Sequence, residues 1–443
     1  MSNQWSSRLS FIITTAAFSI GLGNIWRFPY IVGEGGGGAF LLVYLILLFI
    51  VGLPMMIIEI GLGRMSSSTT LVGFGKISKQ PIWNGLGWLG VLTAQIIMCY
   101  YVMILAWVAV YFIDNLTGNI SGLGTEDLER HFILIAANSK KIVIFIFGIM
   151  TIAFLIIRQG LQSGLERYSK YMIFTFILLL LGLAIWASTL QGAGLGYKWY
   201  LLPDFSKINL AVILSALGQL FFSIGIGMAI AFTFGGYTNN RENIITSTGW
   251  IVFMDTFIAV LAGLLIFPAI FSFSLSPESG PNLIFITMAS IFSRLDYGEF
   301  LGVMFFLLLF LAGFTSLLSN LQVLTNSFQD KYKLSFFNAL FFVSAFIAFG
   351  SIPVVYSFSD SPLLLFGMTV FDLLDFVTNK IMLPLSGLFI AIFGAYVIGF
   401  KKLKAHLELG AENINIGNYW KYIIQWVIPI SLLIILINGI FLA

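Results

Sequence analysis

Several oxygen-bearing side chains stand inside long apolar runs, where a polar group is costly unless it has a partner. Asp255 interrupts the run 244–273, and Thr315 and Ser316 interrupt the run 300–328. A carboxylate in hydrocarbon is by default functional, and a cation is its natural partner. Two alternatives remain open. Asp255 can be a protonated acid that hydrogen-bonds a neighbouring helix, and the two hydroxyls can bond back to their own helix. We expect these oxygens to bind a small cation such as sodium.

A glycine-rich interruption of the first apolar run indicates where such a site is formed. Gly21 and Gly23 weaken the helix there, and Arg27 and a following proline add a charge and a helix breaker at membrane depth. Freed N–H groups at a half-helix N-terminus suit a carboxylate, and freed carbonyls at a half-helix C-terminus suit a cation. Asn24 adds a side-chain oxygen within the break. The alternative is a flexible kink with Arg27 reaching to the membrane surface.

A second run carries a similar interruption. Gly225 and Gly227 fall near the middle of the predicted sixth span, and Ser223 directly precedes this segment. The second interrupted span begins five spans after the first, so the two halves of the chain would have opposite topology. Glycine pairs in membrane helices more often serve packing, but paired broken helices in inverted halves are typical of a transporter site at the bilayer midplane.

Other polar residues in the apolar runs could support this site. Arg27 lies just outward of the first break and Asp375 near the outer end of the tenth span, so an ion pair between them could close the site from outside. Glu59 could accept from backbone donors of a neighbouring broken helix. Tyr101 could offer its hydroxyl to a substrate carboxylate. A structural ion pair, or simple packing for Tyr101, is the alternative in each case.

The composition excludes several classes of protein. Of 443 residues, 59% are hydrophobic and 9% are charged, with a mean hydropathy of +0.99, whereas soluble domains carry roughly 25% charged residues. The net charge of +3 is dispersed, which argues against nucleic-acid binding. The lone cysteine, Cys99, excludes a disulfide framework. The sequence has no phosphate-binding loop and no nucleophile–histidine pair in its spans, so we expect neither ATP-driven transport nor an enzyme.

The predicted fold is an all-α polytopic membrane protein with eleven transmembrane helices in a single domain, 1–443. The predicted spans are 9–34, 39–64, 84–113, 140–158, 165–190, 208–235, 244–273, 300–328, 335–357, 363–398 and 419–442. The polar stretch 277–299 is expected to be an outer loop with short helices. Fourteen Lys and Arg residues fall on one side and six on the other, which predicts a cytoplasmic N-terminus and an external C-terminus in the inner (plasma) membrane.

Motifs along nearly the whole chain resemble those of the neurotransmitter:sodium symporters, and the bacterial amino-acid transporter branch in particular. They are Trp5-Ser6-Ser7-Arg8, Gly21 to Tyr30, Gly36-Gly37-Gly38-Ala39-Phe40, Gly52-Leu53-Pro54 with Glu59 and Gly63-Arg64, Gly164-Leu165-Glu166-Arg167, Gly218 to Ser223 and Ala312-Gly313-Phe314-Thr315-Ser316. The resemblance implies an inverted five-plus-five helix repeat, about 9–190 and 208–398, with discontinuous first and sixth helices and an extra helix at 419–442.

The resemblance also implies two sodium sites, one amino-acid site and two gates. The first sodium site falls on Ser19, Asn24, Ser223 and Asp255. The second falls on Ala17, Ile20, Ala312, Thr315 and Ser316. The substrate's amino and carboxylate groups meet Ser19, Leu22, Gly23, Tyr101, Phe222 and Ser223, and its side chain is lined by Ile97, Gly225, Met228, Ser316 and Asn320. The outer gate is Arg27 with Asp375 under a Phe222 lid, and the inner gate involves Trp5, Tyr237 and Asp330.

Some positions depart from the family pattern. Ser2 stands where an inner-gate arginine is expected, and Asp255 stands where animal members have a neutral asparagine. Animal members bind chloride nearby, so we hypothesise that the fixed carboxylate replaces chloride and that no chloride is required. Gly225 is expected to enlarge the side-chain pocket and Asn320 to add a polar edge, which favours a larger, aromatic amino acid.

The sequence therefore predicts sodium-coupled symport of a hydrophobic or aromatic amino acid by alternating access, by a monomer or weak dimer in the lipid bilayer. One alternative is a proton-coupled carrier of the same fold, with Asp255 as the titrating group. Another is a non-transporting membrane receptor. A channel would need a continuous polar path or a repeated pore motif, and neither is seen.

Overall fold

Nearly every apolar run of the chain is helical, because a helix satisfies its own backbone groups in hydrocarbon. The computed structural model describes residues 4–277, 282–359, 361–411, 414 and 416–441. In this part of the chain, nine helices are long and apolar enough to cross a membrane. They run over Gly38–Ser66, Pro81–Leu116, Ser139–Ile157, Leu161–Ser188, Ile244–Ser272, Gly298–Tyr332, Phe336–Phe358, Val370–Leu407 and Tyr419–Ile440.

Several of these spans are divided by π-helical or 3-10 turns. The elements that make them up are α3 (Gly38–Leu47), η2 (Leu48–Gly52), α4 (Leu53–Ser66), η3 (Pro81–Trp83), α6 (Asn84–Leu116), α8 (Ser139–Ile157), η4 (Leu161–Glu166), α9 (Arg167–Ser188), α13 (Ile244–Ser272), α15 (Gly298–Tyr332), α16 (Phe336–Val355), η7 (Tyr356–Phe358), α17 (Val370–Asp375), η8 (Phe376–Met382), α18 (Leu383–Ile392), η9 (Phe393–Gly399), α19 (Phe400–Leu407), α20 (Tyr419–Tyr422), η10 (Ile423–Val427) and α21 (Ile428–Phe441).

Two further pairs of helices are interrupted where the glycine motifs predict it. The first pair is α1 (Arg8–Ser19) followed by η1 (Gly23–Arg27) and α2 (Phe28–Glu34), which bends by 52° and counts as a tenth span. The second pair is α11 (Leu210–Ser223) and α12 (Ile230–Gly236). Each half of this pair is too short to cross a membrane alone. It occupies the predicted sixth span, 208–235.

Short elements connect the spans. They are α5 (Thr70–Ser78), α7 (Thr125–Ala137), α10 (Ala193–Leu201), η5 (Phe205–Lys207), η6 (Leu283–Met288), α14 (Ala289–Ser293) and the antiparallel strands β1 (Leu364–Leu365) and β2 (Met368–Thr369). The predicted loop 277–299 does contain short helices, η6 and α14. Its residues 278–281 lie outside the described part of the chain.

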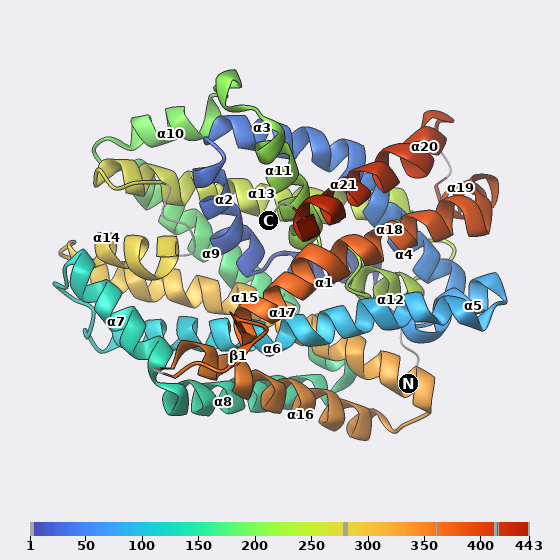
Figure 1. The fold of residues 1–443 in the computed structure, drawn as a ribbon, viewed down its shortest axis with the longest axis horizontal. Helices are drawn as coiled ribbons and strands as arrows, with labels where there is room; N and C mark the ends of the chain where they lie inside the picture. Colours follow the sequence, from blue (N-terminus) through green and yellow to red (C-terminus); the bar gives the residue numbers. More distant parts are fainter. Residues whose placement is uncertain (1–3, 278–281, 360, 412–413, 415, 442–443) are drawn as a thin grey trace.

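Long helices frame the interrupted ones. α15 packs along α6 and also contacts α9 and α16, while α12 packs against α4. α1 lies against α13 and α15. In Figure 1, α7, α10 and α14 gather at one end of the bundle, and α5 and α19 lie at the opposite end. The two breaks are therefore held between continuous helices, and the candidate site lies there.

Candidate functional site

The break after α1 frees two backbone carbonyls from their helical donors. In an unbroken helix the carbonyls of Ala17 and Ile20 would accept from the N–H groups four residues later. Instead, the Gly21 N–H donates to Asn24 Oδ1 over 3.2 Å, and the Asn24 N–H donates to the Gly21 carbonyl over 3.1 Å. Ala17 and Ile20 are fully buried. Their carbonyls, at the C-terminal end of a half-helix, are suited to a small cation.

α15 contributes the other members of the predicted second sodium site. Ser316 Oγ donates to the carbonyl of Phe18 over 2.8 Å, which ties α15 directly to the last turn of α1. Thr315 Oγ1 donates to the Ala312 carbonyl over 2.9 Å within α15. All three α15 residues are buried. The predicted second sodium site is thus drawn from two helices that contact one another at this level.

The predicted first sodium site includes a buried carboxylate held by neutral donors. Asn24 Nδ2 donates to Asp255 Oδ1 over 2.8 Å, and Ser223 Oγ donates to Asp255 Oδ2 over 3.2 Å. The fourth predicted member, Ser19, lies in the last turn of α1, where its hydroxyl donates to the carbonyl of Thr15 over 3.4 Å. Asp255 is fully buried, and the ion pairs of the described residues do not include it. This donor set fits a cation, which such a carboxylate attracts.

The second break is stabilised by side chains from other helices. Its residues Gly225, Gly227 and Ala229 have positive φ angles of 65°, 82° and 67°, so the helix cannot continue through them. The Gly227 N–H donates to Glu59 Oε2 over 3.0 Å, and Ser386 Oγ donates to the Gly227 carbonyl over 2.9 Å. The structure confirms that Glu59 accepts from the backbone of a neighbouring broken helix. These bonds satisfy backbone groups that the break exposes.

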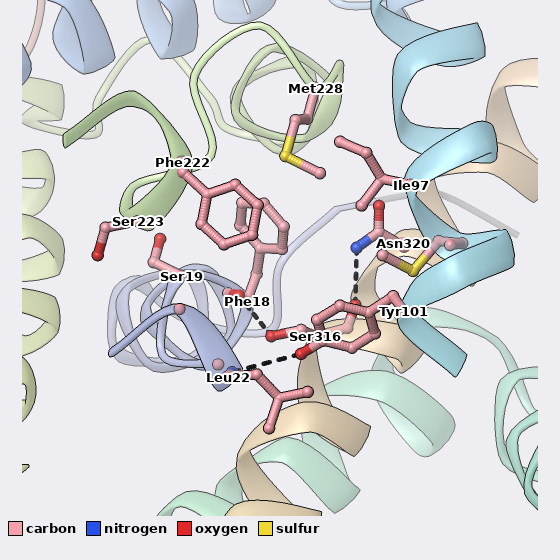
Figure 2. A pocket seen from close by; sticks show the side chains of 13 residues that line it. Phe18, Ser19, Leu22, Ile97, Tyr101, Phe222, Ser223, Met228, Ser316 and Asn320 are labelled. Carbon is pink, nitrogen blue, oxygen red and sulfur yellow. Dashed lines mark hydrogen bonds between the residues drawn. The ribbon is translucent and has the colours of Figure 1, made fainter. Parts of the chain in front are cut away.

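A cavity lies between the two breaks, α6 and α15 (Figure 2). Its lining contains ten of the eleven predicted substrate residues, which are Ser19, Leu22, Gly23, Ile97, Tyr101, Phe222, Ser223, Met228, Ser316 and Asn320. Tyr101 Oη accepts from the N–H of Leu22 at 3.5 Å, close to the limit for a hydrogen bond. Side chains far apart in the sequence therefore meet around one small space.

Gly225 is the predicted substrate residue that does not line this cavity. A Cβ at this position would lie 2.4 Å from the ring of Phe18, because that ring already occupies the adjoining space. The expectation that Gly225 enlarges the pocket is therefore wrong in this structure. Phe18, Gly21 and Met98 also line the cavity, and the sequence reasoning missed them. Phe18 directly precedes the predicted site residue Ser19, and this position in the sequence could have indicated that it lines the cavity.

A wider cavity adjoins the first one on the side of Arg27. Its volume is about 340 Å³, against about 40 Å³ for the inner cavity, and Phe222 and Tyr101 line both. The Arg27 guanidinium lies 4.6 Å from the centroid of the Phe222 ring. A Cβ on Gly23 would lie 3.2 Å from the same ring. The half-buried Phe222 thus lies where the two cavities adjoin, next to Arg27.

The predicted pair of Arg27 and Asp375 is not formed in this structure. Both residues line the wider cavity. However, Arg27 Nη1 donates to Gln219 Oε1 over 2.8 Å, and Asp375 Oδ1 accepts from Asn379 Nδ2 over 2.6 Å. Gln219 also donates through Nε2 to the Gly23 carbonyl over 3.0 Å, so it joins α11 to the first break. The sequence reasoning did not identify Gln219 as the partner of Arg27.

On the side of the site opposite to Arg27, Trp5 and Tyr237 pack against each other. Trp5 Nε1 donates to the carbonyl of Phe234 over 3.1 Å, and the Trp5 and Tyr237 rings lie 6.1 Å apart. Tyr237 Oη accepts from Asn326 Nδ2 over 2.5 Å. These contacts fasten the segment before α1 to α12, and α12 to α15. Two of the three predicted inner-gate residues therefore lie together.

Asp330, the third predicted inner-gate residue, is held by its own neighbours. Its Oδ2 accepts from the N–H and hydroxyl of Thr69 over 3.2 and 2.9 Å, and Lys333 Nζ lies 3.9 Å from its Oδ1. A cavity of about 620 Å³ that includes Tyr237 in its lining opens beside it. Ser2, at the position where an arginine partner is expected, lies outside the described residues.

Comparisons with known proteins agree with this architecture. The model of the sodium:neurotransmitter symporter family matches residues 2–124 and 135–442. An uncharacterized sodium-dependent transporter of Haemophilus influenzae is 34% identical over 99% of this chain and 98% of its own length. A second one, from Bacillus subtilis, is 31% identical over 98% and 97%.

A solved structure shares the fold over almost the whole chain. The crystal structure of MhsT in complex with L-phenylalanine superposes with a TM-score of 0.89 at 32% identity, and the match covers 98% of this chain and 99% of MhsT. This similarity confirms the predicted fold class. This chain is a multi-pass, sodium-dependent transporter of the sodium:neurotransmitter symporter family, and not an enzyme.

Proposed function

We propose that this protein imports an amino acid together with sodium, and that two sodium ions bind beside the substrate. The freed carbonyls of Ala17 and Ile20, at the end of α1 that the Ser316–Phe18 hydrogen bond holds against α15, are the observation that carries this proposal. The Ala312 carbonyl and the buried hydroxyls of Thr315 and Ser316 complete a set of five oxygens. Because none of the five carries a formal charge, they suit a monovalent ion better than a divalent one, which prefers carboxylates. A sodium ion there bridges α1 to α15 and stabilises the contact between them.

The other ion binds at the predicted first sodium site, around Asp255. The Asp255 carboxylate, Asn24 and Ser223 lie at the two breaks, directly beside the cavity. The substrate carboxylate approaches the Leu22 N–H and the Tyr101 hydroxyl, which already lie 3.5 Å apart. Substrate and ion then neutralise each other in a buried place, where either alone is costly. This mutual dependence is the physical basis of coupling.

The residues that separate the site from each side of the membrane suggest how alternating access works. On one side, the Phe222 ring separates the site from the cavity that holds Arg27 and Asp375. On the other side, Trp5 and Tyr237 fasten the start of α1 to α12. We propose that Phe222 closes under Arg27 and Asp375 once ions and substrate are bound, and that the inner half of α1 then moves away. Because most Lys and Arg residues flank the Trp5 end, this end is assigned to the cytoplasm.

MhsT is bound to L-phenylalanine in its structure, and this supports an amino acid as the substrate here. The cavity lining has the same implication, because Phe18, Ile97, Met98 and Met228 surround one part of it with apolar groups. We therefore propose a hydrophobic or aromatic amino acid.

Uptake by the purified protein in proteoliposomes tests the proposal. A labelled amino-acid mixture is added outside, and the imposed gradient is sodium, potassium or a pH difference. We expect accumulation with a sodium gradient and none with potassium. Accumulation that follows the pH gradient and requires Asp255 would establish a proton-coupled carrier instead. No uptake of any amino acid, with binding retained, would indicate a receptor.

A further inference from the structure

A further cavity opens near the start of α1, away from the two cavities at the breaks. Its volume is about 600 Å³, and it is lined by residues 158–163, by two glutamines of α15 and by two phenylalanines of α16. None of these residues lines the substrate cavity or the cavity beside Arg27. α8, which ends just before residue 158, lies side by side with α16 along one edge of the bundle (Figure 1). The cavity therefore lies at the perimeter of the protein, where a membrane lipid can reach it.

This cavity carries a positive charge at its exposed side. Arg158 is exposed, and the ion pairs of the described residues do not include it. No acidic side chain is present among the residues that line the cavity. A guanidinium group binds phosphate through several N–H groups at once. Arg158 is therefore suited to the phosphate of a ligand.

A buried amide oxygen lies deeper in the same cavity. Gln322 is fully buried, and its Oε1 has no hydrogen-bond partner among the described residues. It precedes Gln329, the other glutamine of the lining, by two turns of α15, which is about 10 Å along the helix. A buried acceptor without a donor is costly, so this oxygen is a candidate contact for a ligand that carries a hydrogen-bond donor.

The orientation of the Gln322 amide is fixed by its neighbours. Gln322 Nε2 donates to Asn326 Oδ1 over 3.2 Å, and Asn326 donates through its own Nδ2 to Tyr237 Oη. Exchanging the nitrogen and oxygen of Gln322 would place two acceptors against each other. The Gln322 nitrogen must therefore face Asn326, and the oxygen is left for a donor.

The remaining wall of the cavity is apolar and continues onto the outer surface of α16. Phe337 is 57% exposed, and its ring lies 5.6 Å from that of Phe154 in α8. One turn farther along α16, Phe341 is 55% exposed. Because α16 belongs to a helix that is long and apolar enough to cross a membrane, we expect these exposed rings to contact acyl chains. A charged cavity that continues into an apolar strip suits an amphipathic ligand.

We infer that this cavity binds a phospholipid whose headgroup joins the phosphate to a terminal hydrogen-bond donor, as in phosphatidylethanolamine. The phosphate binds Arg158, the ammonium group donates to the Gln322 oxygen, and the acyl chains lie along Phe337 and Phe341. Phosphatidylcholine has the same phosphate but no N–H group, so it leaves the Gln322 oxygen without a donor. Gln322 thus makes the site selective for the headgroup. The inference concerns a site outside the substrate cavity and does not depend on the proposed function.

A comparison of two lipids tests the inference on the unmodified protein. Phosphatidylethanolamine and phosphatidylcholine with identical acyl chains are titrated into the detergent-purified protein, and bound lipid is counted by native mass spectrometry. We expect the Kd for phosphatidylethanolamine to be about tenfold lower, since only this lipid provides a donor for Gln322. Equal affinity for the two lipids would overturn the inference.

A soluble headgroup distinguishes a lipid site from a site for a free phosphate compound. O-phosphoethanolamine has the same phosphate and ammonium groups but no acyl chains. We expect a large excess of it to leave the bound phosphatidylethanolamine in place, because it makes no contact with the rings of α16. Displacement at concentrations similar to that of the lipid would show that the ligand is a soluble phosphate, and would overturn the assignment to a lipid.

Two variants locate the site. In Gln322→Leu the preference for phosphatidylethanolamine over phosphatidylcholine should fall close to one. The control Gln95→Leu should keep the preference, because Gln95 is also buried with an unpaired Oε1 but does not line the cavity. Arg158→Gln should weaken the binding of both lipids about tenfold, whereas Arg167→Gln, at an exposed arginine outside the lining, should not. A preference that survives in Gln322→Leu would contradict the assignment.

Discussion

The guanidinium of Arg27 donates from Nη1 to Gln219 Oε1 over 2.8 Å, and Gln219 in turn donates to the carbonyl of Gly23. Two residues separated by 192 positions thereby connect the first break to α11. The same guanidinium lies over the ring of Phe222, which stands between the two cavities. Gln219 therefore positions the Arg27 guanidinium over the Phe222 ring.

Gln219→Leu should impair the closure of the site. Without its acceptor, Arg27 loses a charge-assisted hydrogen bond, of a kind that contributes roughly 1.5–3 kcal/mol. We expect the KM for uptake to rise about tenfold. The control is Gln95→Leu, because Gln95 is also a buried glutamine but donates to the carbonyl of Val343 in α16. A KM that is unchanged in Gln219→Leu would exclude this positioning role.

Uptake by the wild-type protein should be equal in chloride and in gluconate, because Asp255 supplies a fixed negative charge beside Asn24 and Ser223. Asp255→Asn removes this charge. We expect uptake in gluconate to fall by about tenfold or more and to be partly restored by chloride, since the buried Tyr44 hydroxyl lies near Asp255 and Ser223. A strict chloride requirement of the wild type would refute the hypothesis.

Thr315→Ala should weaken sodium binding at the second site. The variant removes one side-chain oxygen from a set of five ligands, and we expect the sodium concentration for half-maximal uptake to rise about tenfold. Thr93→Ala is the matched control, because Thr93 is also buried and also donates to a carbonyl of its own helix, over 2.6 Å. The prediction fails if both variants shift the sodium dependence equally.

Glu59→Gln should destabilise the second break. The charge-assisted bond from Gly227 becomes a neutral one in a fully buried place, at a cost of about 1–3 kcal/mol. We expect a fall of a few degrees in the melting temperature of the purified protein. Asp204→Asn provides the comparison, because Asp204 accepts from the Ser206 N–H over 3.0 Å in an exposed turn. There, water replaces the lost interaction, and little change is expected. Equal shifts in the two variants would argue against a special role of Glu59.

The sequence alone located the elements of this protein. Apolar runs marked the spans, because the bilayer imposes length and hydropathy on each segment independently. The glycines at positions 21, 23, 225 and 227 marked the breaks, because backbone freedom is a local property. The acceptor role of Glu59 could also be anticipated, since a carboxylate in hydrocarbon requires a donor.

The tertiary structure decided which side chains meet. Phe18 fills the space that the sequence assigned to an enlarged pocket at Gly225, because a ring on one broken helix packs against the backbone of the other. Arg27 bonds to Gln219 and not to Asp375. Such partners depend on the relative placement of helices far apart in the chain. Residue type and spacing determine which polar and apolar side chains each helix carries. The packing of the helices determines which residues those side chains contact.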